Sequence, residues 1–237
     1  MTKQLITILN PKGLCYREQI KPTLLLLLSA ILPTIHIYFG SIDFARNTFP
    51  SISGFGASNY MFISMFVLMG LLPVAIVLFL FKDSLRDYGL TIGDWRKGFP
   101  LTTFLVIIIA GLMLYPSSQT ADFRNIYPLD KSAGETLFNF IRFEILRGLF
   151  FYTAWEFFFR GFMLFGLRKF VGEWIAICVQ TIPSCLWHIG LPTGEIFASI
   201  VAGILFGIIA VRTNSILWVL ILHFLIGLFL DLFIVIT

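Results

Sequence analysis

The sequence Trp-Glu-Phe-Phe-Phe-Arg-Gly-Phe-Met-Leu-Phe, residues 155–165, places one carboxylate and one guanidinium inside an aromatic and aliphatic run. Glu156 and Arg160 stand four residues apart, so on a helix they share a face and can pair, with the acid in the favoured N-terminal position. If this helix crosses a membrane, each charge near its centre opposes insertion by about 2.5–3.5 kcal/mol. The pair is therefore expected to face the protein interior or a wet cavity, and the acid is a candidate functional residue.

The composition of the whole chain predicts an integral membrane protein. Of its 237 residues, 58% are hydrophobic and 13% are charged, whereas soluble domains are typically about 45–50% apolar and about 25% charged. No linker, charge block or internal repeat divides the chain, so we expect one integrated domain in a lipid bilayer. The net charge of +4 bears on membrane topology and gives no sign of nucleic-acid binding. The three cysteines do not suggest a disulfide framework.

Apolar segments predict an all-α, polytopic fold with about seven transmembrane helices. Their approximate ranges are 23–40, 60–81, 101–115, 149–167, 173–189, 195–211 and 216–236. An amphipathic interfacial helix is expected from Glu135 to about Arg147, started by a capping box between Ser132 and Glu135. We place a break at Gly148, because one straight helix over 135–169 would be about 50 Å long against a hydrocarbon core of about 30 Å.

The domain has two parts that differ in content. Residues 1–134 hold a basic N-terminal segment and three spans, and residues 135–237 hold the candidate chemistry. The basic residues favour a cytoplasmic N-terminus, because that orientation places eleven lysines and arginines on the cytoplasmic side and three outside. In the sixth span, Ser199, Gly203 and Gly207 recur at four-residue intervals, which predicts close helix packing.

The last spans and their turns contain the polar residues that could do chemistry, namely Glu156, Arg160, His188, Glu195 and His223. An acid with two histidines suits two chemistries. In one, the carboxylate activates water while imidazoles orient that water or hold an oxyanion. In the other, imidazoles and the carboxylate bind a divalent metal such as zinc, whose bound water becomes the nucleophile. A buried ion pair with two hydrogen-bonded core histidines is the purely structural alternative.

Residue counting and motif searches limit these readings. Counted from the cytoplasmic helix ends at about 1.5 Å per residue, Glu156 and His223 lie about 18 and 16 Å deep, and His188 about 28 Å. His188 must therefore reach inward, or the fifth helix must start lower or break. The absence of His-Glu-x-x-His and Gly-x-Ser-x-Gly motifs argues against a zincin and a serine hydrolase.

An ordered set of motifs resembles the CPBP (CAAX protease and bacteriocin-processing, or Abi) family of intramembrane proteases. The set comprises Glu156-Phe-Phe-Phe-Arg160-Gly161, His188 closing the next span, Gly203 and Gly207 before Arg212-Thr-Asn-Ser215, and His223 in the last span. The resemblance covers roughly residues 135–237. It implies a helical, glutamate-dependent or metal-dependent endopeptidase in which the first motif supplies the water-activating acid and two histidine motifs complete the site.

The sequence departs from the family pattern at three positions. Trp155 stands where the family has the first of two adjacent glutamates, and Gly227 stands where an asparagine commonly follows the last histidine by four residues. Ser184 stands where the second motif has a phenylalanine. Glu195 is a possible compensating carboxylate; its structural alternative is a first-turn acid favoured by the helix dipole.

These observations together predict an intramembrane endopeptidase that cleaves a membrane-associated protein or peptide in a bacterial-type cell membrane. Glu156 is the expected base, Arg160 its orienting partner, and His188 and His223 the ligands of water, oxyanion or metal. The alternative is a catalytically inactive relative that acts as a membrane scaffold or immunity protein. A transporter with Glu156 in a proton relay is a third reading, although the chain shows no inverted repeat.

Overall fold

The computed structural model describes residues 17–237, which form helices joined by short connections, with no strand in this range. Five helical segments are long and apolar enough to cross a membrane. They are Ile20–Phe39 (α2), Gly54–Phe81, Trp95–Ser118, Thr193–Thr213 (α13) and Leu217–Ile236 (α14). The prediction of a polytopic helical membrane protein is confirmed. Most of the predicted basic segment at the N-terminus lies outside the described residues.

Two of the long segments contain stretches of π-helix. Gly54–Phe81 consists of α4 (Gly54–Met65), a π stretch (Phe66–Leu71), α5 (Leu72–Ala75) and a second π stretch (Ile76–Phe81). Trp95–Ser118 consists of α6 (Trp95–Ile109), a π stretch (Ala110–Leu114) and α7 (Tyr115–Ser118). The connections carry α3 (Ile42–Thr48), α8 (Ala121–Ile126) and 3-10 turns at Arg17–Gln19, Leu85–Tyr88 and Lys131–Gly134.

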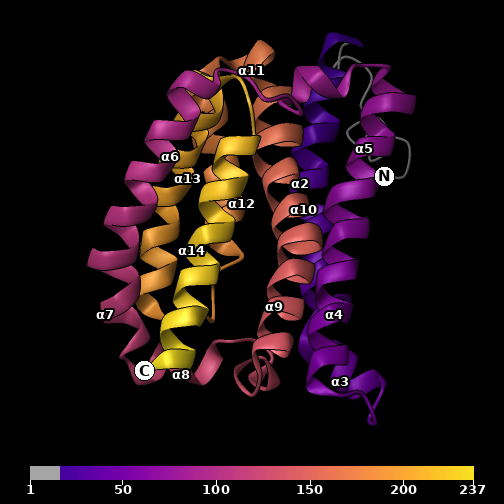
Figure 1. The fold of residues 1–237 in the computed structure, drawn as a ribbon. Coiled ribbons are helices and arrows are strands. Elements are labelled where there is room, and N and C mark those ends of the chain that lie inside the picture. Colours follow the sequence, from indigo (N-terminus) through magenta and orange to yellow (C-terminus); the bar gives the residue numbers. More distant parts are fainter. Residues whose placement is uncertain (1–16) are drawn as a thin grey trace.

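One helical run, residues 137–171, passes through the centre of the molecule (Figure 1). It joins α9 (Leu137–Leu146), a π stretch (Arg147–Tyr152), α10 (Thr153–Glu156), a second π stretch (Phe157–Phe165) and α11 (Gly166–Val171). All residues from 154 to 167 are buried, as expected for a helix that is apolar on every side. The stretch quoted first is therefore the core around which the other helices pack.

The predicted break at Gly148 and the separate interfacial helix are wrong, because the helical run continues through Gly148 without interruption. Arg147 does not lie at the membrane surface; it is 2% exposed and paired with two buried acids. These internal partners make an interfacial position unnecessary for its charge. The predicted capping box is wrong as well. Thr136 caps the helix, and its side chain accepts a hydrogen bond from the Asn139 backbone nitrogen.

α12 (Glu173–Leu186) and α13 pack closely against each other. α12 is shorter than its predicted span and ends before His188. Against it lies α13, where a Cβ at Gly203 would meet Thr181 Cγ2 at 2.6 Å and one at Gly207 would meet Ile177 at 3.0 Å. The close packing predicted from the small residues of the sixth span is thus confirmed.

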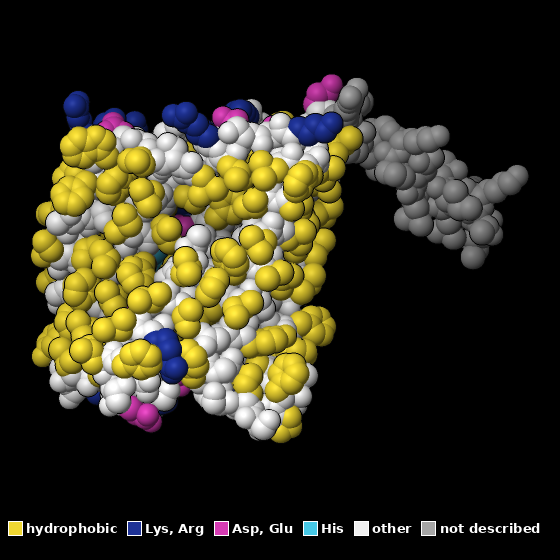
Figure 2. Space-filling view, turned by 45° about the vertical axis from the view of Figure 1, so that its right-hand side comes forward, with side chains coloured by type: hydrophobic (Ala, Val, Ile, Leu, Met, Phe, Trp, Pro, Cys, Tyr) yellow, Lys and Arg dark blue, Asp and Glu magenta, His cyan; other side chains and the backbone are white. Residues whose placement is uncertain are grey.

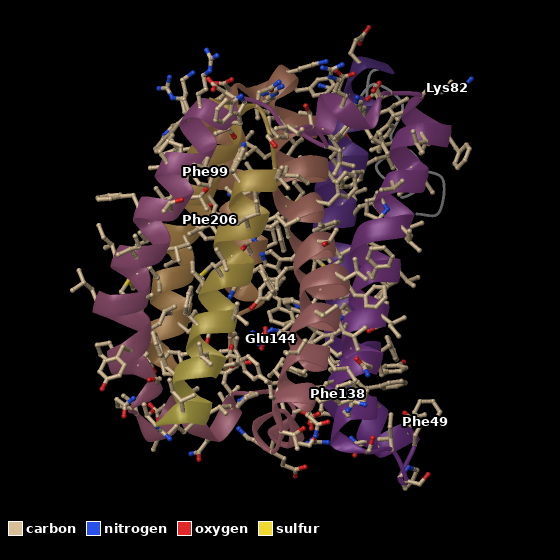
Figure 3. All side chains as sticks on the ribbon, viewed as in Figure 1. Phe49, Lys82, Phe99, Phe138, Glu144 and Phe206 are labelled. Carbon is tan, nitrogen blue, oxygen red and sulfur yellow. The ribbon has the colours of Figure 1, made fainter. Side chains whose placement is uncertain are left out.

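The surface shows how the molecule fits a bilayer. Hydrophobic side chains form a broad belt, and many basic side chains gather at one end of the molecule (Figure 2). Lys82 lies at this end, and Phe49 lies at the opposite end (Figure 3). At the basic end, Trp218 at the start of α14 donates its indole N–H to the Ile92 carbonyl at 2.8 Å and so holds the polar loop after Phe81.

Candidate active site

A cavity of about 590 Å³ lies between the central helical run and the ends of α2, α12 and α13. Exposed apolar side chains of Ile37, Tyr38 and Ile189 line its outer part. Its polar lining includes His188, His223, Glu195, Arg147, Tyr127 and Tyr152, together with His36, Ser41 and Asp43 from α2 and the start of α3. Two of the five predicted site residues, Glu156 and Arg160, are not in its wall. The cavity thus brings together three of the predicted site residues, His188, Glu195 and His223, from segments that are separate in the sequence.

Glu156 lies directly behind His223. Its Oε1 atom accepts a hydrogen bond from His223 Nδ1 at 2.6 Å and one from Arg160 Nη1 at 3.3 Å. Glu156 is 0% exposed and Arg160 is 2% exposed, so the predicted i,i+4 pair exists inside the protein. A carboxylate can only accept at this contact, which assigns the proton to Nδ1 and leaves the Nε2 lone pair of His223 free.

His188 reaches the same cavity from the turn after α12. Because α12 ends at Leu186, this turn brings the imidazole inward and resolves the depth difference expected from residue counting. His188 Nδ1 lies 2.7 Å from the Ser184 carbonyl oxygen, which can only accept, so Nε2 of this ring also keeps its lone pair. The Trp155 ring lies between the two histidines, with ring centroids 5.4 Å from His188 and 6.0 Å from His223.

Glu195 adds a carboxylate to the cavity wall from the first turn of α13. Its Oε1 accepts a hydrogen bond from the Tyr127 hydroxyl at 2.7 Å, and its buried Oε2 has no partner among the described residues. Burial and the nearby charge of Glu195 raise the pKa of the Tyr127 hydroxyl well above its ordinary value. Tyr127 therefore stays protonated and donates to Glu195 across the physiological range.

A second buried ionic cluster lies next to this site, and the sequence analysis did not find it. Arg147 Nη1 donates to Asp231 Oδ2 at 2.8 Å, and Arg147 Nη2 donates to Glu144 Oε2 at 3.0 Å. All three side chains are at most 3% exposed, and Glu144 lies between α9 and α14 (Figure 3). One signal was available, since Asp231 in the middle of an apolar span needs a compensating partner.

The donor set does not fit a resident metal ion. Within residues 17–237, no group of three or more His, Cys, Asp or Glu side chains could hold a metal. His188 and His223 could each offer Nε2, but the Glu156 oxygen that is nearest to them already binds His223 Nδ1. Cys185 does not supply the third ligand, because its Sγ contacts the Ile196 carbonyl oxygen at 3.8 Å.

Part of the chain matches a known protein family. Residues 137–229 match the family model described as Type II CAAX prenyl endopeptidase Rce1-like. The matched region contains all five predicted site residues and agrees with the resemblance seen in the motifs. No curated protein and no solved structure matches the chain.

Proposed function

We propose that this chain is an intramembrane endopeptidase that hydrolyses a membrane-associated protein or peptide, as the match of residues 137–229 to the Rce1-like type II CAAX prenyl endopeptidase family supports. The observation that carries the proposal is the Glu156–His223 pair, which presents a free imidazole nitrogen to a cavity shared with His188. The apolar belt and the family together support a multi-pass membrane protein that acts on a protein substrate.

In the proposed reaction, His223 is the group that removes a proton from water. Its Nε2 faces the cavity side, while Nδ1 is held by Glu156. Transfer of the water proton creates an imidazolium, and the Glu156 carboxylate at 2.6 Å stabilises that charge. Glu156, predicted from the sequence as the base itself, then acts through His223, and Arg160 holds the carboxylate in place by donating a hydrogen bond to Oε1.

His188 and Glu195 complete the proposed site from the other side of the cavity. The free Nε2 of His188 can accept a hydrogen bond from the same water and so fix its direction of attack. Glu195 can accept the water proton in place of His223, or it can pass a proton to the leaving amine. Its Oε2 is available for this because it has no hydrogen-bond partner among the described residues. The water proton finally goes to the amine nitrogen when the C–N bond breaks.

A divalent metal such as zinc stays an alternative prediction, and no step of the proposal depends on one. Among residues 17–237 no group of three or more His, Cys, Asp or Glu side chains is arranged to hold a metal, which does not match a protein-held zinc site. Elemental analysis of the purified full-length protein, before and after dialysis against a chelator, measures bound metal directly. Stoichiometric zinc that leaves together with activity would replace the proposed water activation by metal chemistry.

The inactive scaffold or immunity protein is the second candidate, and Trp155 is the observation in its favour. This side chain takes the position of the first glutamate of the family motif and lines the cavity with an indole. The two candidates differ in their need for Glu156. A scaffold needs only the fold, whereas hydrolysis needs the carboxylate behind His223.

The deciding experiment compares new protein N-termini in membranes from cells that make the wild-type chain or Glu156→Gln at equal abundance. Glu173→Gln is the matched control, because this exposed first-turn acid of α12 lies outside the cavity. We expect termini that are present with the wild type and the control but absent with Glu156→Gln. Identical termini in all three membranes would refute proteolysis through Glu156 and favour the scaffold.

A further inference from the structure

Tyr152 lines the cavity beside His223 but has no part in the water activation described so far. The two ring centroids lie 4.7 Å apart, and Tyr152 stands four residues before Glu156 on the same helical run. The tyrosine ring is 7% exposed. Its hydroxyl forms no hydrogen bond with any residue that the structure describes, and the hydroxyl oxygen is not fully buried, so it is accessible from the cavity that the ring lines.

Gly227 creates the space that this hydroxyl occupies. A Cβ atom at Gly227 would lie 1.9 Å from the Tyr152 hydroxyl oxygen and 2.8 Å from Arg147 Nη2. Any side chain at this position would therefore displace the hydroxyl. Gly227 follows His223 by four residues, one turn along the same face of α14, so the hydroxyl lies against the backbone close to the histidine.

Two neighbouring donors in the cavity wall, Arg147 and Tyr127, are already occupied. Arg147 donates its two terminal nitrogens to Asp231 and Glu144, and the Tyr127 hydroxyl donates to Glu195. The Tyr152 hydroxyl, by contrast, is an O–H donor without a partner among the described residues, on a ring that contacts the His223 imidazole. Trp155 and Trp187 also line the cavity, and neither indole N–H has a hydrogen-bond partner among the described residues, so both are rival donors.

We propose that the Tyr152 hydroxyl donates a hydrogen bond to the carbonyl oxygen of the scissile peptide bond as that oxygen becomes an oxyanion. This inference rests on the proposed endopeptidase function. When the water oxygen bonds to the carbonyl carbon, the C=O π electrons move to oxygen and His223 takes the water proton. Tyr152 keeps its own proton and stabilises the new negative charge. Collapse of the intermediate reforms C=O, breaks the C–N bond and delivers the proton to the leaving amine.

The same geometry explains how the chain tolerates glycine where the resembling family commonly has a polar side chain. Tyr152 reaches across from the central helical run and puts a hydroxyl into the space over Gly227. Positions 152 and 227 are then alternatives for supplying one polar group.

The test uses the purified full-length chain in proteoliposomes and a peptide that spans a cleavage site found by the comparison of N-termini. Tyr152→Phe should lower kcat about 10²- to 10³-fold, with KM changed less than about threefold and unchanged thermal unfolding. Tyr115→Phe, on the exposed outer face of α7, is the matched control and should keep wild-type kinetics. Gly227→Ala should also lower kcat, because it displaces the hydroxyl while leaving Tyr152 in the sequence.

Three outcomes would overturn the assignment. Full kcat in Tyr152→Phe would remove the hydroxyl from the reaction, and a rise in KM with unchanged kcat would assign it to substrate binding. A loss of kcat in Trp155→Phe without one in Tyr152→Phe would move the role to the indole. A wild-type protein that cleaves no peptide refutes the endopeptidase function, and the inference falls with it.

Discussion

The buried cluster of Glu144, Arg147 and Asp231 gives the sharpest prediction about stability. Arg147→Met removes the cation and leaves two acids, each at most 3% exposed, without a partner. Breaking a buried ion pair by removing one member typically costs about 3–5 kcal/mol. Because Arg147 serves both acids at 2.8 and 3.0 Å, we expect a loss in this range. That corresponds to a decrease of about two to three and a half powers of ten in the folding equilibrium constant.

The assay is reversible unfolding of the purified protein in mixed detergent micelles of increasing denaturing fraction, followed by tryptophan fluorescence. Arg96→Met is the matched control, because this exposed arginine lies on the first turn of α6 and has no buried acid beside it. The triple variant Glu144→Gln/Arg147→Met/Asp231→Asn removes every charge of the cluster and should recover most of the loss. The reasoning would be refuted if the free energy of unfolding of Arg147→Met were within about 1 kcal/mol of the wild-type value. It would also be refuted if the triple variant were no more stable than Arg147→Met.

Two further predictions concern helix packing and the basic end. Gly203→Leu should lower the free energy of unfolding by roughly 1–3 kcal/mol, because the new Cβ would meet Thr181 Cγ2 at 2.6 Å. The same micelle assay should show no such loss for the control Gly111→Leu, because a Cβ at Gly111 has no neighbour within 4 Å. Burial opposes ionisation of Asp83, but the hydrogen bond and charge of Lys21 hold the pKa of its carboxyl below the ordinary value. A lowered folded pKa stabilises the fold above the unfolded pKa, and this contribution is lost as the pH falls through the folded pKa. Asp83→Asn should therefore lower the free energy of unfolding by up to about 1 kcal/mol at neutral pH and leave it unchanged in strong acid. Urea unfolding curves at several pH values would measure this difference. An equal loss at all pH values would contradict the prediction.

The sequence predicted the centre of the fold well because the charge pattern was local. Glu156 and Arg160 lie four residues apart, so their pairing needed only helix geometry, and their cost in lipid required a buried position. The small residues of the sixth span likewise indicated close packing from their spacing alone. In both cases the physical constraint acts within one helix.

Contacts between distant segments could not be predicted in this way. Asp231, one of the two partners of Arg147, lies 84 residues away in the sequence. Without this contact, the charges near Arg147 resembled those of an interfacial helix. His223 reaches Glu156 across 67 residues, so the acid that was expected to activate water directly instead contacts an imidazole. The position of His188 depends on where α12 ends, which the apolar pattern placed three residues too late.

The position of the cavity opening has a consequence for when a substrate can be cut. α2 begins at the basic end of the molecule, and its other end supplies Ile37 and Tyr38 to the outer part of the cavity. With the predicted cytoplasmic N-terminus, this opening faces away from the ribosome. A newly made polypeptide would then meet the site only after its scissile segment had entered or crossed the bilayer. Cleavage would mark completed translocation, so that blocking export should protect the substrate even when the protease is abundant.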